Sequence, residues 1–428
     1  MSSKSFLVAC VLVTCGLLVG AVALEGCGGS PRSQLQFWHI QNYSPTQEVV
    51  NGAFARFQAS HPEVTVDAVA VANDPFKTKL QVAVSSGDVP DVFHTWGGGM
   101  FRTYVKAGVV ADLTDDLAAH GWSDRFNPAA AKCLTFDGRL YALPADVAPV
   151  VMWYNKKLFA EHGIAVPKTF DELKSVCRTL KEKSVTPIAL GNIDRWPGCF
   201  YFDYLATRIG GTAPVRAAAE RAPGGTFEHP SFIEAGRKLR ELVDLGAFPD
   251  GASGLKDGEA RNLFFTGRAA MMLMGTWTLA QVSTEAPSFA PDMECFAFPA
   301  VTGGQGSPTT VVGGVNAAYA VSARSAQPQA ARDLAFELVS DQTCRAWATT
   351  GRIPALSRET VEPMLAPQSK PAAEILFAAD EIQLYYDQYL PPALAEKHKA
   401  TTTDLFLGKL TPERAAAEME AAARDLTR

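Results

Sequence analysis

The sequence predicts an α/β protein, because short apolar runs with the two-residue period of strands alternate with runs of helical spacing. Residues 35–40 and 64–71 form the first two predicted strands, and apolar side chains recur at helical spacing over 50–57 between them. A second helix is predicted over 76–84, and a short strand follows at 92–93. The first third of the chain therefore has a β-α-β-α-β order.

The later part of the chain continues this alternation. The predicted strands and helices there share the same signals, apolar runs bounded by turn residues, and they are an extended stretch at 141–154 broken by Pro144 and Pro149, a helix at 170–180, a strand at 188–190, a helix at 232–245, strands at 268–273 and 311–321, and a helix at 330–347. Beyond Gly351 the pattern is mostly helical.

Composition narrows the class of protein. The 428 residues predict two or three domain-sized units, each large enough to bury its own core. Hydrophobic residues make up 47% and charged residues 20% of the chain, which is ordinary for a globular protein. The formal net charge is -6 and no basic run stands out, so a nucleic acid is not an expected partner.

The N-terminus carries an export signal. Lys4 is followed by a small-and-apolar run over residues 6–24, and small residues follow the run. A charged start, an apolar stretch and a small residue before the cut are typical of a secretion signal, here residues 1–26. An uncleaved transmembrane anchor is the alternative, since the run approaches the roughly 20 residues that span a bilayer.

Cys27 follows this signal directly. The stretch Leu24-Glu25-Gly26-Cys27 resembles a bacterial lipobox, in which the cysteine receives a lipid. Leu24 and Gly26 fit that pattern, whereas Glu25 departs from it, which puts efficient processing in question. With either the lipid or the anchor, the rest of the chain lies outside the membrane and tethered to it, with residues 27–34 as a flexible tether.

The cysteines do not form a recognisable disulfide framework. Without the signal and Cys27, an odd number remains at irregular spacing, so at most two bridges are expected and their pairing stays open. Cys177 lies at helical spacing among apolar residues, which predicts a buried thiol. The remaining cysteines are Cys133, Cys177, Cys199, Cys295 and Cys344.

Several local patterns then occur in a fixed order. They are KLQVAVSSGDVPDV at 79–92, DGRLYALP at 137–144, MWYNKKLFAEHGI at 152–164, FFTGRAAMMLMGTW at 264–277, FELVSDQ at 336–342 and GRIP at 351–354. Together they resemble the carbohydrate-type extracellular solute-binding proteins of ABC importers, the family that includes maltose-binding proteins. The Trp-Gly-Gly-Gly loop at 96–99 and Trp196-Pro197 are most similar to binding proteins for short plant oligosaccharides.

The resemblance implies a two-lobe, periplasmic-binding-protein-like (Venus-flytrap) fold, in which crossing strands act as a hinge. The expected lobes are residues 35–145 plus 313–351, and residues 146–312 plus 352–428. Such lobes close on a ligand in the cleft between them. The implied function is capture of a di- or oligosaccharide and its delivery to an ABC transporter permease, by a secreted, lipid-tethered monomer that is not an enzyme and needs no cofactor.

Tryptophans are the first candidates for ligand contact, because a sugar offers apolar C–H faces that stack on flat rings. Trp277 closes the GRAAM…G…W motif, where the family carries a stacking tryptophan. Trp96 lies in the Gly-rich loop and Trp196 in the loop after 188–190. For any single tryptophan, core packing is the competing interpretation. The others are expected mostly in the core: Trp38, Trp153 and Trp347, with Trp122 unassigned.

Polar side chains that both donate and accept hydrogen bonds would hold the hydroxyl groups. The segment after the first strand offers Asn42, with Gln41 and His39 next, although it could simply cap the following helix. Asp146 stands at the first crossover, with a hinge-structural role as the alternative. The weaker candidates are Asp194 and Arg195 beside Trp196, Gly314 for close backbone approach, and Asp387 from the C-terminal helices.

Two other functions remain as alternatives. A glycoside hydrolase would need two carboxylates across the sugar, such as Asp146 with Asp194 or Asp387, but no motif supports the pairing. A metal or anion binder on the same fold is suggested by Tyr385-Tyr386, which resembles the adjacent tyrosines of ferric-ion-binding relatives. The seven histidines are scattered without ligand spacing, and no P-loop, dinucleotide fingerprint or GxSxG elbow occurs.

Overall fold

The computed structural model describes residues 33–426. The predicted signal at 1–26 and the predicted lipidation site Cys27 lie outside these residues. The first strand begins at Ser33, so Ser33 and Gln34 pair in the sheet and are not part of a flexible tether. No helix within 33–426 has the length and apolar character needed to cross a membrane.

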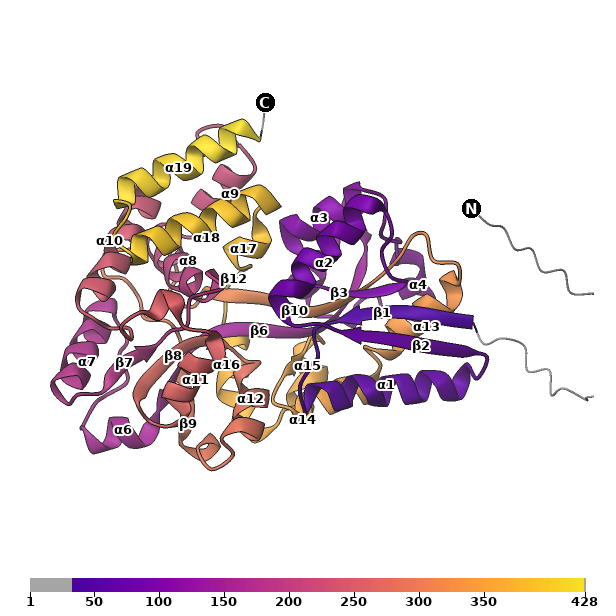
Figure 1. Cartoon of the computed structure of the whole chain (residues 1–428), viewed down its shortest axis with the longest axis horizontal. Coiled ribbons are helices and arrows are strands. Elements are labelled where there is room, and N and C mark those ends of the chain that lie inside the picture. Colours follow the sequence, from indigo (N-terminus) through magenta and orange to yellow (C-terminus); the bar gives the residue numbers. More distant parts are fainter. Residues whose placement is uncertain (1–32, 427–428) are drawn as a thin grey trace, which may run out of the picture.

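The first third of the chain has the predicted β-α-β-α-β order. Strands β1 (Ser33–His39), β2 (Val64–Ala70) and β3 (Val92–Thr95) are parallel, with β1 between the other two. Helices α1 (Thr46–Ser60) and α2 (Asn73–Ser86) lie on opposite faces of this sheet (Figure 1). Polar loops at the carboxyl ends of these strands are therefore brought to one edge.

Two long strands run through the whole molecule. β6 (Ala142–Asn155) and β10 (Val311–Val321) pair antiparallel, and β10 also pairs with β3. At its other end β6 pairs with β8 (Ala269–Gly275), which pairs with β7 (Thr186–Ala189). The sheet order is therefore β2-β1-β3-β10-β6-β8-β7, a single sheet that both halves of the molecule share.

The prolines do not interrupt β6, contrary to the prediction of a broken stretch. Pro144 and Pro149 each pair with β10 on one side only. The strands on the other side of β6 begin elsewhere, with β11 (Ile353–Pro354) at residues 146–147 and β8 at residue 150. A proline nitrogen at an unpaired side costs no ladder hydrogen bond, so the strand continues.

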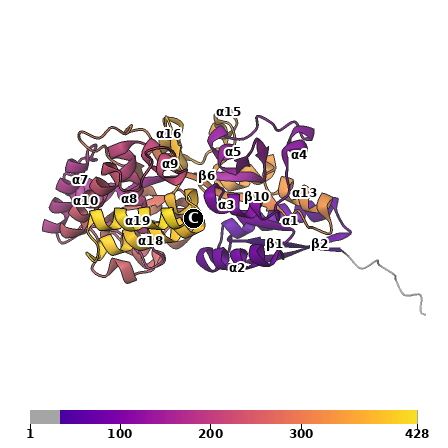
Figure 2. The same cartoon turned by 90° about the horizontal axis from the view of Figure 1, so that it is seen from above.

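Two separate cores divide the molecule into lobes, which Figure 2 shows lying side by side. The N-terminal lobe packs on a core that includes β1–β3 and the first part of β6, and the C-terminal lobe packs on a core that includes the rest of β6, β7 and β8. Within β6 the change falls between Val147 and Val150, and within β10 between Val312 and Val315. Only a few segments cross from one lobe to the other.

The last crossing lies later than the boundary predicted at residue 351. Leu356, Val361 and Leu365 still pack in the N-terminal core, because β11 pairs with β6 on that side of the hinge. Ala372 then contacts the C-terminal core while Ala373 contacts the other, so the transfer falls in α16 (Lys370–Phe377).

The predicted helix at 330–347 is two helices. α13 (Pro328–Glu337) ends before Ser340, whose hydroxyl accepts a hydrogen bond from the Thr343 amide and caps α14 (Asp341–Thr349). A capping serine satisfies an amide that the first turn leaves free, and so favours a new helix start.

None of the five cysteines in the described chain forms a disulfide. Cys177 is wholly buried, as predicted.

The remaining elements complete the two lobes. In the N-terminal lobe they are α3 (Gly98–Lys106), α4 (Thr114–Ala119), α5 (Pro128–Leu134), β4 (Thr135–Phe136), β5 (Arg139–Leu140) and α15 (Arg358–Val361). In the C-terminal lobe they are α6 (Lys156–Glu161), α7 (Phe170–Glu182), α8 (Trp196–Gly210), α9 (Ala213–Ala219), α10 (Pro230–Asp244), α11 (Asp257–Phe265), α12 (Thr278–Glu285), β9 (Met293–Phe296), β12 (Ile382–Gln383), α17 (Tyr386–Tyr389), α18 (Pro392–Phe406) and α19 (Pro412–Asp425).

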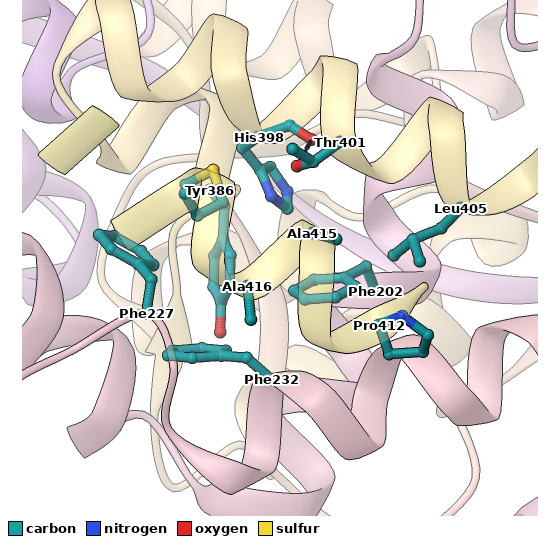
Figure 3. A pocket seen from close by; sticks show the side chains of 11 residues that line it. Phe202, Phe227, Phe232, Tyr386, His398, Thr401, Leu405, Pro412, Ala415 and Ala416 are labelled. Carbon is teal, nitrogen blue, oxygen red and sulfur yellow. Dashed lines mark hydrogen bonds between the residues drawn. The ribbon is translucent and has the colours of Figure 1, made fainter. Parts of the chain in front are cut away.

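A buried ion pair fixes α17, which carries residues of the cleft described below. Asp203 on α8 accepts hydrogen bonds from His398 Nε2 over 2.9 Å and from the Tyr386 amide over 3.1 Å. Figure 3 shows His398 and Tyr386 beside a cavity of about 20 Å³ that apolar side chains line. The mostly apolar cavity offers a water molecule few hydrogen-bond partners. Water therefore could not replace the ion pair without a loss of stability.

The protonation of this pair makes stability depend on pH. Burial alone would lower the pKa of His398, but Cys199 and Asp203 beside it raise that pKa to about 10. Burial raises the pKa of Asp203. The hydrogen bonds that His398 and the Tyr386 amide donate to its carboxylate favour the ionised form, so we place the proton on the imidazole.

Replacing both partners, Asp203→Asn with His398→Leu, should flatten the pH dependence of stability. Because the folded pKa lies above the value of about 6.5 for unfolded histidine, the pair contributes fully below about pH 6.5 and is lost as pH rises through about 10. Urea unfolding at about pH 7 and about pH 10 should show a larger fall in unfolding free energy for the wild type. Equal falls in both proteins would contradict the assignment.

Candidate functional site

A cleft of about 390 Å³ lies between the two lobes. The loop after β1, the start of α2 and Trp96 line it from the N-terminal lobe, while α8, α11, α12 and α17 line it from the C-terminal lobe. Asn316 lies on the crossing strand β10, and Arg352 directly precedes β11, which pairs with the crossing strand β6. We call Gln41, Asn316 and Arg352 the cleft floor. The site is thus built from both lobes and from one of the strands that cross between them.

One wall of the cleft is aromatic. Trp277 lies 6.2 Å from Trp196 and 6.4 Å from both Phe200 and Tyr385, measured between ring centroids. The planes of the two tryptophans are 69° apart, so they meet edge to face. Both keep part of their surface exposed while packing against the C-terminal core. Such half-exposed rings give a ligand flat apolar faces at fixed positions.

Gly275 allows the Trp277 ring to take this position. A Cβ built on Gly275, the last residue of β8, would lie 2.1 Å from the Trp277 ring. The ring therefore folds back over the end of β8, where any side chain would displace it. The sequence motif predicts a glycine here, and the structure supplies the steric reason.

The opposite wall contains Trp96, which is only 7% exposed. The Lys77 ammonium lies 5.2 Å from the centroid of the Trp96 ring. The same ammonium lies 3.7 Å from Asp387 Oδ2, an ion pair that joins α2 of the N-terminal lobe to α17 of the C-terminal lobe. Trp96 is therefore covered by a cation from its own lobe, and it is less open than Trp277.

The Gly-rich loop beside Trp96 serves contact between the lobes. A Cβ on Gly98 would lie 2.5 Å from the Gln388 carbonyl oxygen, and one on Gly99 would lie 2.5 Å from that of Tyr389. Glycine is required there because the start of α3 approaches the backbone of α17. The loop thus brings Trp96 close to the C-terminal wall.

Each charged side chain lining the cleft has a partner of opposite sign. Arg261 pairs with Asp257 and also lies 2.9 Å from Glu285. Lys77 pairs with Asp387, and Arg352 pairs with Asp146 over 3.3 Å. Across the described residues the cleft therefore presents no uncompensated charge, which suits a neutral ligand. To pair with a charged ligand, one of these side chains would have to leave its partner, and the partner's charge would then be buried without compensation.

Several cleft side chains have polar atoms without a partner in the described chain. They are Gln41 Nε2, Trp196 Nε1, Gln281 Oε1, Arg352 Nε and Gln388 Oε1. A buried polar atom left unpaired costs about 1–3 kcal/mol. Donors and acceptors both occur in this set, so a ligand rich in hydroxyl groups can satisfy them, since a hydroxyl does both.

Asp146 does not line the cleft, which differs from its predicted ligand role. Asp146 is 1% exposed, and its Oδ2 accepts hydrogen bonds from Asn316 over 2.9 Å and from Arg352. Burial raises the pKa of Asp146, and Arg352 and Asn316 oppose that shift. The hinge-structural alternative therefore describes its position better, directly behind the cleft floor.

Four further predicted residues also lie outside the cleft lining. His39 is 2% exposed and stacks on Phe37 at 4.8 Å, and burial lowers its pKa to about 4, so the imidazole is neutral. Gly314 faces the Leu384 side chain. Arg195 pairs with Glu396 over 2.8 Å, and Asp194 is not among the residues that line the cleft. Trp196, the first residue of α8, therefore lines the cleft, whereas its neighbour Arg195 pairs outside the cleft lining.

The cleft does gather six of the predicted residues: Trp96, Trp196, Trp277, Gln41, Asn42 and Asp387. It also contains residues that the sequence analysis missed, among them Tyr43, Lys77, Arg261, Gln281, Asn316, Arg352 and Gln388. Arg352 belongs to the GRIP pattern and Tyr43 adjoins Asn42, so local motifs carried some signal for both. Arg261 and Gln281 face the cleft from ordinary helices, and only packing reveals them.

Within residues 33–426 no group of three or more His, Cys, Asp or Glu side chains is placed to hold a metal ion. The adjacent tyrosines also diverge. The Tyr385 hydroxyl donates to the Ala148 carbonyl over 2.8 Å, and Tyr386 lines the separate cavity of Figure 3.

Comparison with known proteins places these features in context. The family model for bacterial extracellular solute-binding proteins matches residues 38–343. The chain is 28% identical over 350 residues to an uncharacterised ABC transporter extracellular-binding protein of Pyrococcus horikoshii, covering 77% of this chain and 75% of that protein. It is 25% identical over 230 residues to the melibiose/raffinose/stachyose-binding protein of Bacillus subtilis, covering 53% of this chain and 52% of that protein.

Solved structures with this fold cover more of the chain. One comes from work on xylan utilization by the thermophilic bacterium Caldanaerobius polysaccharolyticus, with 32% identity, a TM-score of 0.85, and coverage of 91% of this chain and 99% of that one. A chitin oligosaccharide binding protein has 25% identity and a TM-score of 0.84, covering 92% and 98%. The two-lobe α/β fold expected from the sequence is thereby confirmed.

Substituting Gly275→Ala should displace the Trp277 ring and destabilise the protein. A methyl group in this contact amounts to overpacking, which costs about 1–3 kcal/mol. Thermal unfolding followed by tryptophan fluorescence should show a lower Tm and an altered emission of the folded state. Gly254→Ala is the matched control, because a Cβ there meets nothing within 4 Å. Equal behaviour of the two variants would contradict the steric role of Gly275.

Proposed function

This chain belongs to the family of bacterial extracellular solute-binding proteins, and we propose that it captures a neutral di- or oligosaccharide and delivers it to an ABC transporter permease. Proteins of this family are receptors for transport, so the chain is a binding protein and not an enzyme. Sugar-binding relatives, including those named for melibiose, raffinose and stachyose and for chitin oligosaccharides, support the ligand class.

The observation that carries the proposal is the aromatic wall formed by Trp196 and Trp277 in a cleft whose charges are all internally paired. Sugars bind through stacking of C–H faces on aromatic rings and through hydroxyl groups that donate and accept. The two rings stand at 69° to each other, so one flat sugar ring cannot stack on both. Two ring contacts therefore favour a ligand with more than one sugar unit.

Binding is expected to close the two lobes around the ligand. The two lobes are joined by β6, β10 and α16, and so few crossing segments suit a hinge. The Lys77–Asp387 pair already links them across the cleft. A ligand that contacts both lobes shifts the population of the protein toward the closed form. In this proposal the permease recognises that closed, ligand-filled form.

Location follows from the family and the N-terminal sequence. We place the protein outside the cell, at the outer face of the cytoplasmic membrane, as a monomer. In this proposal residues 1–26 are removed and Cys27 carries the lipid, with Glu25 as the departure from the lipobox pattern. A lipid anchor would keep the receptor close to its permease.

Binding should depend on Trp277. With melibiose, raffinose, xylo-oligosaccharides and chito-oligosaccharides as the panel, at least one should bind the wild type by calorimetry and raise its Tm. Trp277→Ala should weaken that binding at least about tenfold, about 1.4 kcal/mol, because the stacking face is lost. Trp122→Phe is the control, since Trp122 packs against the N-terminal core away from the cleft. An amino acid or metal that binds where every saccharide fails would overturn the proposal.

Anchoring should depend on Cys27. Cys27→Ser removes the thioether-forming thiol, so the variant expressed in a bacterium should leave the membrane fraction or remain unprocessed, while the wild type stays with membranes. Intact-mass spectrometry of the wild type should show a lipid-modified chain that begins at Cys27. An unmodified wild-type chain, or a Cys27→Ser variant that is membrane-bound and fully processed, would contradict the lipid anchor.

A further inference from the structure

Gln41 and Arg352 are joined at the cleft floor. Nη2 of Arg352 donates to Oε1 of Gln41 over 3.0 Å. Gln41 is fully buried and Arg352 is 3% exposed, yet both line the cleft. An arginine can only donate, so this bond fixes which end of the Gln41 amide faces Arg352. The NH₂ end must point elsewhere, and in the described chain its nitrogen has no partner.

Arg352 is held in its turn by the two strands that cross between the lobes. Its Nη1 donates to Oδ2 of Asp146 on β6 over 3.3 Å, and Asn316 on β10 donates to the same oxygen over 2.9 Å. The guanidinium also lies 4.8 Å from the centroid of the Trp347 ring. A planar guanidinium with several bonds has one orientation, so Asp146 determines where Arg352 can reach.

We infer that Asp146 and Arg352 are positioning residues, which orient the Gln41 amide so that its NH₂ group donates to an oxygen of the innermost sugar unit. The inference rests on the proposed function and deepens it by naming one polar contact and the groups that set its polarity. Asp146 does not touch the sugar, and its effect passes through Arg352. With the amide reversed, Gln41 would offer an acceptor, which neither a ring oxygen nor a glycosidic oxygen can satisfy.

The fixed orientation of the Gln41 amide contributes to the selectivity of binding as well as to its affinity. A site built around a fixed donor discriminates against a ligand that lacks the matching acceptor, because the donor is then buried without a partner. A freely rotating amide would tolerate either kind of ligand group. The buried relay from Asp146 to Arg352 to Gln41 removes that freedom before the ligand arrives.

A double-mutant cycle on ligand binding tests the relay. The background is Asp146→Asn with Arg352→Met, which removes both buried charges together, because removing one alone leaves the other unpaired. Calorimetry measures the Kd of the panel saccharide that the wild type binds most tightly. Gln41→Leu should weaken binding about tenfold in the wild type, about 1.4 kcal/mol, but less than about twofold in the neutral background.

Gln388→Leu is the matched control. Gln388 is a second amide of the same cleft, but its Nε2 donates to Asp387 over 3.2 Å and has no part in the relay. Its substitution should weaken binding by the same factor in both backgrounds. Arg352→Lys gives a second background should the neutral pair fold poorly, since a single ammonium can keep Asp146 but lacks the fork that also reaches Gln41.

The outcomes separate the two proposals. A wild type that binds a panel saccharide, with Gln41→Leu costing the same factor in every background, overturns the positioning role and leaves the sugar receptor intact. A purely structural role for Asp146 and Arg352 would lower Tm without changing the effect of Gln41→Leu, and so overturns it too. A wild type that binds no saccharide refutes the proposed function, and the positioning role falls with it.

Discussion

The structure depends on the antiparallel pairing of β6 with β10, because these two strands belong to both lobes and form the middle of the sheet. The pairing is close. A Cβ on Gly313 would lie 2.7 Å from the Ala148 carbonyl oxygen, so the strands approach where the two cores meet. Prolines opposite this stretch are tolerated because they face no partner on the other side. The hinge therefore consists mainly of the paired strands β6 and β10, and the cleft lies beside them, between the two lobes.

The cleft joins two physical requirements that usually oppose each other. Aromatic rings supply apolar surface, and buried polar atoms without partners demand hydrogen bonds. Each charged side chain that lines the cleft is paired within the protein, which keeps the electrostatic field in the cleft low, as Lys77 with Asp387 illustrates. What remains is a surface of flat faces and unpaired donors and acceptors, which matches the two sides of a carbohydrate. Asp146 lies behind the floor and accepts a hydrogen bond from Arg352.

Sequence reasoning predicted the elements better than the site. β10 was predicted with its observed bounds, and the first β-α-β-α-β unit was found in order, because hydrophobic period is a local property. Trp277 was found from a motif whose glycine has a local steric role. Asp146 and His39 were assigned to the ligand from their place after strands, but burial of a side chain depends on neighbours distant in sequence. Arg261 and Gln281 were missed for the same reason.

Taken alone, the sequence determined the α/β class, the family and the tryptophans available for stacking, since each of these depends on patterns of residues close together in the chain. Only the tertiary structure decided which side chains share the cleft, which charges cancel, and that the chain stays in the N-terminal lobe through Leu365. Contacts such as Arg352 with Gln41 join residues that lie far apart along the chain. Their geometry arises only when both cores have folded and the crossing strands bring the lobes together.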